Sequence, residues 1–93
     1  MEKLSLIFAT LNDSIATNLA MAGAIYQLEN DEIPYEIILV NNGSSEQETI
    51  NLQSFLEFHK DFPITYYEYD IKGTIPPHSF GVVKATGTHI MMP

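Results

Sequence analysis

The sequence predicts an α/β fold: an open, mainly parallel β-sheet with helices on both faces, in the order βαβαβαβ. Short apolar runs of strand length alternate with longer segments whose apolar residues recur at helical spacing. Turn-forming residues separate most of these segments. The 93 residues, of which 45% are hydrophobic, suit one domain with a packed core. Such alternation implies parallel strands joined by right-handed crossovers.

The first half of the chain contains two predicted strands and one predicted helix. Residues 3–10 are a largely apolar run, and the polar residues 12–14 that follow favour the start of a helix. Apolar residues then recur at helical spacing as far as residue 30, and Pro34 prevents any continuation. Residues 36–40 form a continuous aliphatic run, which is typical of a strand buried on both faces.

A second helix and a third strand follow. Residues 41–45 form a turn cluster, and Ser45 with Glu48 fits a capping box at the start of the helix. The segment Asp-Phe-Pro ending at Pro63 terminates this helix. Residues 64–69 are rich in tyrosine and β-branched residues, so they are predicted to form a strand.

The last quarter of the chain predicts a loop, a short helix and a fourth strand. Residues 70–73 form the loop, and the proline pair at 76 and 77 suits the first turn of a helix. This helix is expected to end near Ala85, with Gly87 capping its C-terminal side. Residues 89–92 have strand composition, and together these elements complete the alternating pattern.

Composition excludes several classes of protein. Twelve acidic side chains against four lysines give a net charge of −8, which predicts no nucleic-acid partner, since phosphate backbones are bound by Lys and Arg. No apolar run approaches the roughly 20 residues that span a bilayer. The absence of cysteine excludes a disulfide scaffold. Without a signal-peptide pattern, we expect a cytoplasmic protein.

The polar residues after each strand are the candidate site. Neither a G-x-G-x-x-G fingerprint nor a P-loop sequence is present, which argues against dinucleotide enzymes and P-loop enzymes. Ligands of open α/β sheets bind beyond the carboxyl ends of the strands. Here those ends carry residues 10–12, 41–44 and 70–73, which should therefore converge on one edge of the sheet.

Three segments have recognisable motifs: residues 5–12 read S-L-I-F-A-T-L-N, residues 36–45 read E-I-I-L-V-N-N-G-S-S, and residues 73–87 contain regularly placed glycine and alanine. In this order they resemble the family-2 glycosyltransferases of the GT-A fold, which is Rossmann-like. The third segment keeps that family's spacing of glycine and alanine. The resemblance implies a nucleotide site formed by Ala9, Thr10, Asn12, Asn41, Asn42, Gly43, Ser44, Gly73 and His78.

The sequence departs from the family pattern at some of these positions. Asn41 stands where the family has an acid that contacts the base, and His78 stands where it has an arginine. An asparagine amide can both accept from and donate to a uracil edge, so the donor is predicted to be a UDP-sugar. His78 could contact a phosphate when protonated. Asp70 is the acidic residue expected nearest to the site.

The resemblance also implies that residues 1–93 are a partial domain, the nucleotide-sugar-binding half of a glycosyltransferase. The family's metal-binding D-x-D motif follows a strand like the one at residues 89–92, so the ligands of a divalent metal, Mg or Mn, are expected beyond Pro93. The parent enzyme would transfer the sugar to an acceptor hydroxyl. No catalytic residue is expected in this chain, which alone would be inactive.

Two other functions fit the same pattern less well. One is a non-catalytic binding or regulatory module, such as a receiver-like domain, in which Asp70 would take the place of the phosphoacceptor. The other is a degenerate glycosyltransferase with a structural role. The apolar residues Ile90, Met91 and Met92 would lie on an exposed sheet edge, so the isolated chain is predicted to form a homo-oligomer.

Overall fold

The computed structural model describes residues 2–69 and 75–93. The seven elements are, in chain order, β1 (Leu4–Thr10), α1 (Ser14–Asn30), β2 (Tyr35–Asn41), α2 (Glu46–Phe58), β3 (Ile64–Glu68), α3 (Pro77–Lys84) and β4 (His89–Met91). The expected βαβαβαβ order is therefore confirmed. Asp70 and Gly73, both expected near the site, lie outside the described residues.

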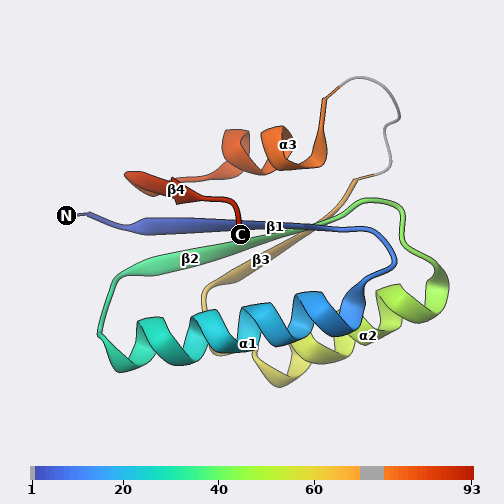
Figure 1. Cartoon of the computed structure of the whole chain (residues 1–93), viewed down its shortest axis with the longest axis horizontal. Coiled ribbons are helices and arrows are strands. Elements are labelled where there is room, and N and C mark those ends of the chain that lie inside the picture. The colour runs from blue at the N-terminus through green and yellow to red at the C-terminus, as the bar shows by residue number, and fades with distance from the viewer. Residues whose placement is uncertain (1, 70–74) are drawn as a thin grey trace.

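The four strands form one parallel sheet with the order β3-β2-β1-β4 (Figure 1). β1 and β2 pair along their whole length, from Leu4 with Tyr35 to Thr10 with Asn41. This topology contradicts the receiver-like alternative, because in a flavodoxin-like sheet β1 lies between β2 and β3. Here β2 separates β1 from β3, as in one half of a Rossmann-type sheet.

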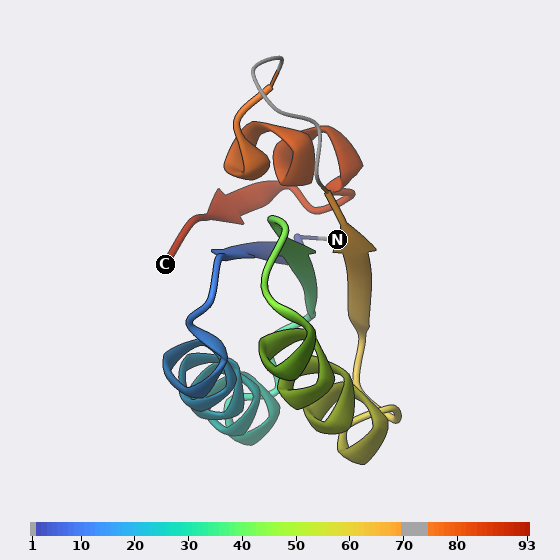
Figure 2. The ribbon, with the colours of Figure 1, turned by 90° about the vertical axis from the view of Figure 1, so that its right-hand side faces the viewer.

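Helices cover both faces of the sheet, as the sequence predicts. α1 and α2 lie side by side under one face, and α3 lies on the other (Figure 2). Leu6 and Leu39 belong to the core that includes the first two helices, whereas Ile7 and Ile38 belong to the core against Phe80 of α3. The aliphatic runs of β1 and β2 thus reflect burial from two sides, since successive side chains of a strand point to opposite faces.

The helix starts differ from the expected capping pattern. Asp13 occupies the N-cap position of α1 without a side-chain hydrogen bond. The Ser45 hydroxyl caps α2 by accepting from the Glu48 backbone amide at 3.4 Å. The Glu48 carboxylate does not return to Ser45; it accepts instead from the Ser14 hydroxyl on α1. Half of the predicted capping box forms, and its other half becomes a contact between α1 and α2.

A polar cluster at the amino edge of the sheet holds the chain where β4 begins. The Glu36 carboxylate accepts from the Ser5 hydroxyl and from the backbone amide of Thr86 at 2.7 Å. The Gly87 amide donates to the Ser5 hydroxyl at 2.8 Å, and a Cβ on Gly87 would lie 2.6 Å from the Lys3 carbonyl oxygen. Gly87 is therefore required for close approach to β1, and its predicted role as a helix cap was wrong, since Ala85 is the C-cap of α3.

Glu36 should make stability depend on pH. Burial raises the pKa of Glu36, but the hydrogen bonds from Ser5 and Thr86 and the charge of Lys3 outweigh it, so the pKa falls below its ordinary value. A carboxyl group with a lowered pKa stabilises the fold above its ordinary pKa and loses this contribution as the pH falls through the folded-state pKa.

We expect Glu36→Gln to lower the free energy of unfolding by about 1.5–3 kcal/mol at pH 7, the usual size for hydrogen bonds to a charged group. Urea unfolding at a series of pH values measures this difference. It should shrink as the pH drops below the ordinary glutamate pKa. A difference that stays constant from pH 7 to pH 3 would contradict the ionic role of Glu36.

Two helical glycines are predicted to respond to alanine in opposite directions. A Cβ on Gly23 of α1 meets no atom within 4 Å, so Gly23→Ala should stabilise the protein by about 0.5–1 kcal/mol through helix propensity. A Cβ on Gly81 of α3 would overlap the fully buried side chain of Ile7. Gly81→Ala should therefore destabilise by about 1–3 kcal/mol. Thermal unfolding compares the two variants, and effects of the same sign would contradict this packing.

Candidate functional site

The carboxyl edge of the sheet brings the first two predicted loops together. Thr10 and Asn41 are paired in the register of β1 and β2. The Asn42 amide continues the ladder by donating to the Thr10 carbonyl at 2.8 Å. The Tyr69 amide does the same from the β3 side, with the Asn41 carbonyl as its acceptor at 2.8 Å. The ends of three strands therefore form one continuous edge, which was the arrangement predicted from the topology.

Asn12 joins the loop after β1 to the loop after β2. Its backbone amide donates to the Ser44 hydroxyl at 2.9 Å, and its side-chain oxygen accepts from the Ser45 amide at 2.7 Å. Asn12 has a φ of 53°, a left-handed conformation that asparagine adopts more readily than most residues, and Gly43 has a φ of 74°. These two positions turn the loops toward each other and fix their relative positions.

The Asn41 side chain is buried and fully engaged within the protein. Its amide nitrogen donates to the Thr49 hydroxyl at 2.9 Å and to the Tyr66 hydroxyl at 3.0 Å. Its amide oxygen accepts from the Ser44 backbone amide at 3.1 Å. Both hydrogens of the amide group are therefore used in holding the loop. Contact between Asn41 and a base stays a prediction, and a base that accepted from this amide would have to replace one of these partners.

Tyr66 extends this network to the surface. Its hydroxyl donates to the Glu68 carboxylate at 3.0 Å. Burial raises the pKa of Tyr66; the hydrogen bond from Asn41 lowers it, and the neighbouring Glu68 carboxylate raises it, with a net increase. Tyr66 therefore remains protonated at neutral pH and acts as the link that receives a hydrogen bond from Asn41 and passes one to Glu68.

The other predicted residues of β1 support the edge from below. Thr10 is buried, and its hydroxyl oxygen accepts from the Thr17 hydroxyl at 2.9 Å. Ala9 is half-buried and paired with Val40. Neither side chain lies on the open surface of the edge, so a ligand here would meet the loop backbones first.

A small pocket opens at this edge beside β3. It has a volume of about 170 Å³. Its walls are formed by Asn41, Gly43, Ser44, Thr49, Glu68 and Tyr69. Sequence reasoning missed Thr49, Glu68 and Tyr69 as site residues. A signal for two of them was present, because Glu68 and Tyr69 stand at the end of a predicted strand, where the side chains of a parallel sheet meet its ligands.

His78 reaches the same edge from the opposite face of the sheet. It is half-buried in the first turn of α3, whose N-terminus lies at the side where β1 and β2 end (Figure 1). The Tyr69 hydroxyl, which donates to the Ile75 carbonyl at 2.6 Å, ties the start of this segment to the end of β3. The structure therefore places His78 near the edge, but not among the side chains of the pocket.

The positive charges of the described residues lie away from this edge. Lys3 precedes β1, Lys60 follows α2 and Lys84 ends α3. The N-termini of the helices, which carry partial positive charge, lie at the carboxyl edge. Among residues 2–69 and 75–93, no group of three His, Asp or Glu side chains could hold a metal ion. In this same part of the chain, no helix combines the length and the apolar character needed to cross a membrane.

Comparison with known proteins identifies the fold. No protein-family model matches the sequence, and no curated protein matches it. The solved structure of mannosyltransferase PcManGT from Pyrobaculum calidifontis, in complex with GDP-Man and Mn²⁺, is similar over 96% of this chain, with a TM-score of 0.75 and 19% sequence identity. This chain spans 26% of that protein. The glycosyltransferase-type fold expected from the sequence is confirmed, while membership of family 2 remains a prediction.

Asn41→Ala tests the role of the buried amide. Removing it takes one hydrogen bond each from the Thr49 hydroxyl, the Tyr66 hydroxyl and the Ser44 amide, so we expect a loss of about 1–3 kcal/mol in the free energy of unfolding. Asn42→Ala, at the adjacent half-buried position, is the matched control and should change stability by less than about 0.5 kcal/mol. Urea unfolding distinguishes them; equal losses would contradict the network.

Proposed function

We propose that this chain is the nucleotide-sugar-binding part of a glycosyltransferase. The observation that carries this proposal is the joined pair of loops at the carboxyl edge of a sheet whose fold matches part of a mannosyltransferase. Binding beyond the carboxyl ends of the strands is the general rule for open α/β sheets. The sequence has no arginine, and the lysines within residues 2–69 and 75–93 lie away from the edge. Among these residues the diphosphate would rely on backbone amides and helix N-termini, together with a cation.

In this proposal the pocket beside β3 receives the base. Its volume of about 170 Å³ suits a flat heterocycle, and Gly43 allows the backbone to come close to it. The diphosphate would extend along the loop toward the N-termini of α1 and α3, where His78 could add a charge when protonated. Asn42 and Ser44, both half-buried at the loop, would contact the ribose or the phosphates.

The chemistry of the pocket favours guanine over the uracil predicted from the sequence. An ionised carboxylate is only an acceptor, and guanine presents two adjacent donors, N1–H and the 2-amino group, which match the two oxygens of Glu68. Uracil presents one N–H between two carbonyl oxygens, which a carboxylate would repel. The uracil prediction depended on the amide of Asn41 or Asn42; the Asn41 amide has its hydrogens engaged internally, and Asn42 does not line the pocket. The similar mannosyltransferase binds GDP-Man.

The described residues lack a group of ligands that fits a divalent metal. In this proposal its ligands belong to a longer parent chain, and the pairing of β4 with β1 supports a place for them. β4 pairs with β1 as far as Met91 with Leu6, four residues before Thr10. A continuation of β4 would therefore bring the fourth residue after Met91 level with the nucleotide edge. This is the position proposed for an acidic motif.

The parent enzyme would transfer the sugar to an acceptor hydroxyl. That hydroxyl would attack the anomeric carbon while the bond from this carbon to the diphosphate breaks, and the described residues would contribute by holding the nucleotide in place. A cytoplasmic location and self-association through the exposed edge of β4 remain part of the proposal. Ile90, Met91 and Met92 are exposed along that edge, which supports the predicted oligomer.

Titration of nucleoside diphosphates into the ¹⁵N-labelled chain tests both the proposed nucleotide binding and the proposed preference for guanine. We expect GDP to shift the amide signals of Asn42, Gly43 and Ser44 and to bind about tenfold more tightly than UDP, a difference of about 1.4 kcal/mol. IDP, which lacks the 2-amino group, should fall between the two. Failure of every nucleotide to shift these amides at millimolar concentration would overturn the proposed function.

Glu68→Gln tests the base assignment separately. This variant should bind GDP and UDP with similar affinity, because an amide can donate to a uracil carbonyl as well as accept. Glu46→Gln removes an exposed acid at the start of α2, outside the pocket, and should keep the preference for GDP. Equal binding of GDP and UDP by the unchanged protein would refute guanine selection while leaving nucleotide binding intact.

A further inference from the structure

α1 has a second apolar stripe that the fold does not bury. Met21, Ile25 and Leu28 face the core, whereas Ile15, Leu19 and Tyr26 are 74%, 70% and 76% exposed. These three lie at positions i, i+4 and i+11, which is one side of a helix, and the half-buried Ala22 lies between them. Glu29 is the only charged residue of α1. A helix that is apolar on both sides is normally covered on both sides.

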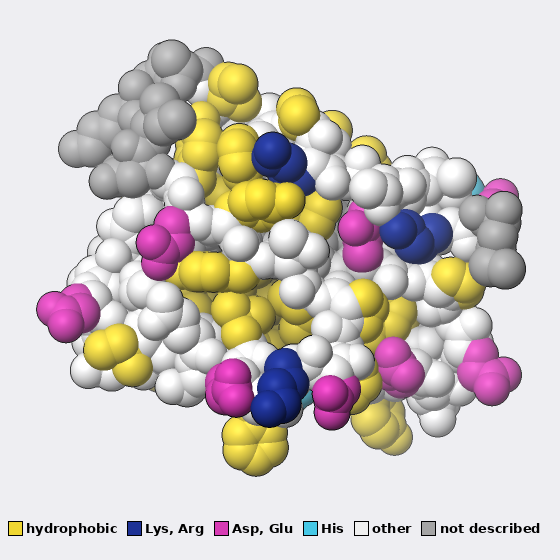
Figure 3. All heavy atoms as spheres, turned by 180° about the vertical axis from the view of Figure 1, so that it is seen from behind, with side chains coloured by type: hydrophobic (Ala, Val, Ile, Leu, Met, Phe, Trp, Pro, Cys, Tyr) yellow, Lys and Arg dark blue, Asp and Glu magenta, His cyan; other side chains and the backbone are white. Residues whose placement is uncertain are grey.

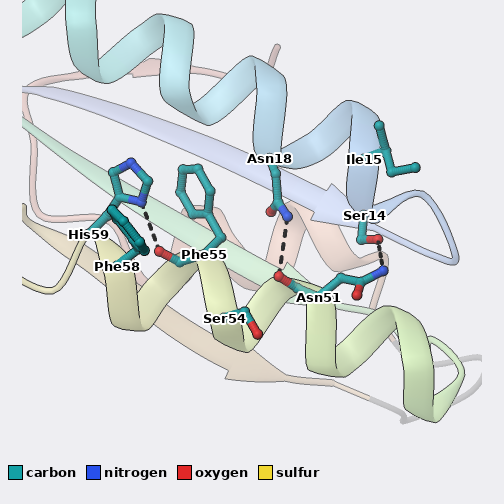
Figure 4. A pocket seen from close by; sticks show the side chains of 8 residues that line it. All are labelled: Ser14, Ile15, Asn18, Asn51, Ser54, Phe55, Phe58 and His59. Carbon is teal, nitrogen blue, oxygen red and sulfur yellow. Dashed lines mark hydrogen bonds between the residues drawn. The ribbon is translucent and has the colours of Figure 1, made fainter.

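Two residues of the stripe, Ile15 and Tyr26, line a groove between α1 and α2. Figure 4 shows the first stretch of this groove, where Ser14 and Asn18 of α1 point toward Asn51 of α2. Ile15, Ser54, Phe55, Phe58 and the C-cap residue His59 complete its lining. This stretch has a volume of about 520 Å³. A second stretch of about 570 Å³ shares His59 and continues along α1 past Ala22 and Tyr26.

The groove has a fixed polar floor and an aromatic wall. The Asn18 amide donates to the Asn51 carbonyl at 3.2 Å, which holds α1 against α2. The His59 ring stacks on Phe55, with ring centroids 3.9 Å apart, while Phe58 is 89% exposed. Exposed aromatic side chains beside an organised floor are the kind of anchor that protein interfaces use.

Carboxylates surround the groove on the described surface. Figure 3 shows hydrophobic side chains projecting from the α1–α2 layer, at the lower edge of the view, among acidic ones. Acidic residues stand at both ends of the two helices and beside Phe58: Asp13, Glu29, Asp31, Glu32, Glu46, Glu57 and Asp61. The lysine in this region is Lys60, which pairs with Glu57 at 3.5 Å. The groove and its apolar walls therefore have a strongly acidic border.

We propose that the groove between α1 and α2 binds an amphipathic helix with Lys and Arg along the flanks of its apolar face, supplied by another polypeptide. The apolar residues of that helix would pack between Ile15, Tyr26 and Phe58, and its cationic flanks would meet the acidic border. The acidic border favours a cationic helix over the other possible occupants of the groove. A second copy of the chain would bring a net charge of −8 against the same border, and an anionic lipid surface would be repelled as well.

The dimensions of the groove set the length of its partner. The stripe from Ile15 to Tyr26 covers eleven residue steps of α1, or about 16 Å at 1.5 Å per residue. A helix of three to four turns would cover this length. This surface is separate from the nucleotide pocket beside β3, so the proposal does not depend on the chemistry assigned there.

The probe for this site is a fluorescein-labelled 18-residue peptide of Leu and Lys, with Leu at positions i, i+3, i+4 and i+7. A Leu/Glu peptide with the same pattern is its control. Fluorescence anisotropy with the full 93-residue chain should show binding of the Leu/Lys peptide at least tenfold tighter than that of the Leu/Glu peptide. This affinity should fall as salt screens the charges.

Matched variants locate the binding surface. Ile15→Gln does not lower helix propensity, removes an exposed apolar side chain that lines the groove and should weaken binding of the Leu/Lys peptide at least fivefold. Val83→Gln makes a similar change on α3, outside the groove, where Val83 is also exposed, and should alter the affinity less than twofold. Circular dichroism verifies that both variants are folded.

Two results would overturn the proposal. One is an equal affinity of the peptide for the Ile15→Gln and Val83→Gln variants, which would mean non-specific attraction to an acidic protein. The other is a dimer in sedimentation velocity that Ile15→Gln, but not Val83→Gln, converts to a monomer, because a second copy would then be the occupant. Loss of peptide binding in Ile15→Gln alone, with a chain that does not dimerise through this groove, supports the proposal.

Discussion

The parallel pairing of β1 with β2 is the constraint on which the rest of the structure depends. Both strands are covered on both faces, so Ile7 and Ile38 must point to one side while their neighbours point to the other. A slip of one residue would reverse every side chain of a strand and exchange the two cores. The same register places Thr10 level with Asn41. The loops that follow can then bond to each other, and the geometry of the candidate site is a direct consequence of core packing.

Most polar side chains at the carboxyl edge of the sheet form hydrogen bonds with other residues of that edge. Asn12 and Asn41 could contact a ligand, yet each holds a loop, Asn12 through Ser44 and Ser45 and Asn41 through Thr49 and Tyr66. A buried amide left without partners would cost stability, so engagement of this kind is expected where a polar residue stands at the end of a buried strand. What remains for a ligand is the loop backbone, the small pocket and the Glu68 carboxylate. Selection of a base would then depend on the end of β3.

The sequence predicts the fold more completely than it predicts the site. Element order, parallel strands and two-sided burial follow from the apolar runs and their spacing, and all three are present. The roles of individual polar residues do not follow, because they depend on which atoms meet in space. Glu48 illustrates this: its spacing from Ser45 predicts a capping box, but Ser14 of α1 offers the carboxylate another donor. Gly87 fits a helix cap in sequence, yet its contact is with a strand more than eighty residues earlier.

The acidity of the chain has different consequences at its two candidate surfaces. At the carboxyl edge the carboxylates oppose a diphosphate, so a nucleotide there needs positive charge from helix N-termini and from a cation. Along the α1–α2 groove the same excess of carboxylates favours a cationic partner and disfavours a second copy. Ser14 connects the two regions, since it lines the groove and its hydroxyl donates to Glu48 in the first turn of α2, next to the loop that Asn12 holds.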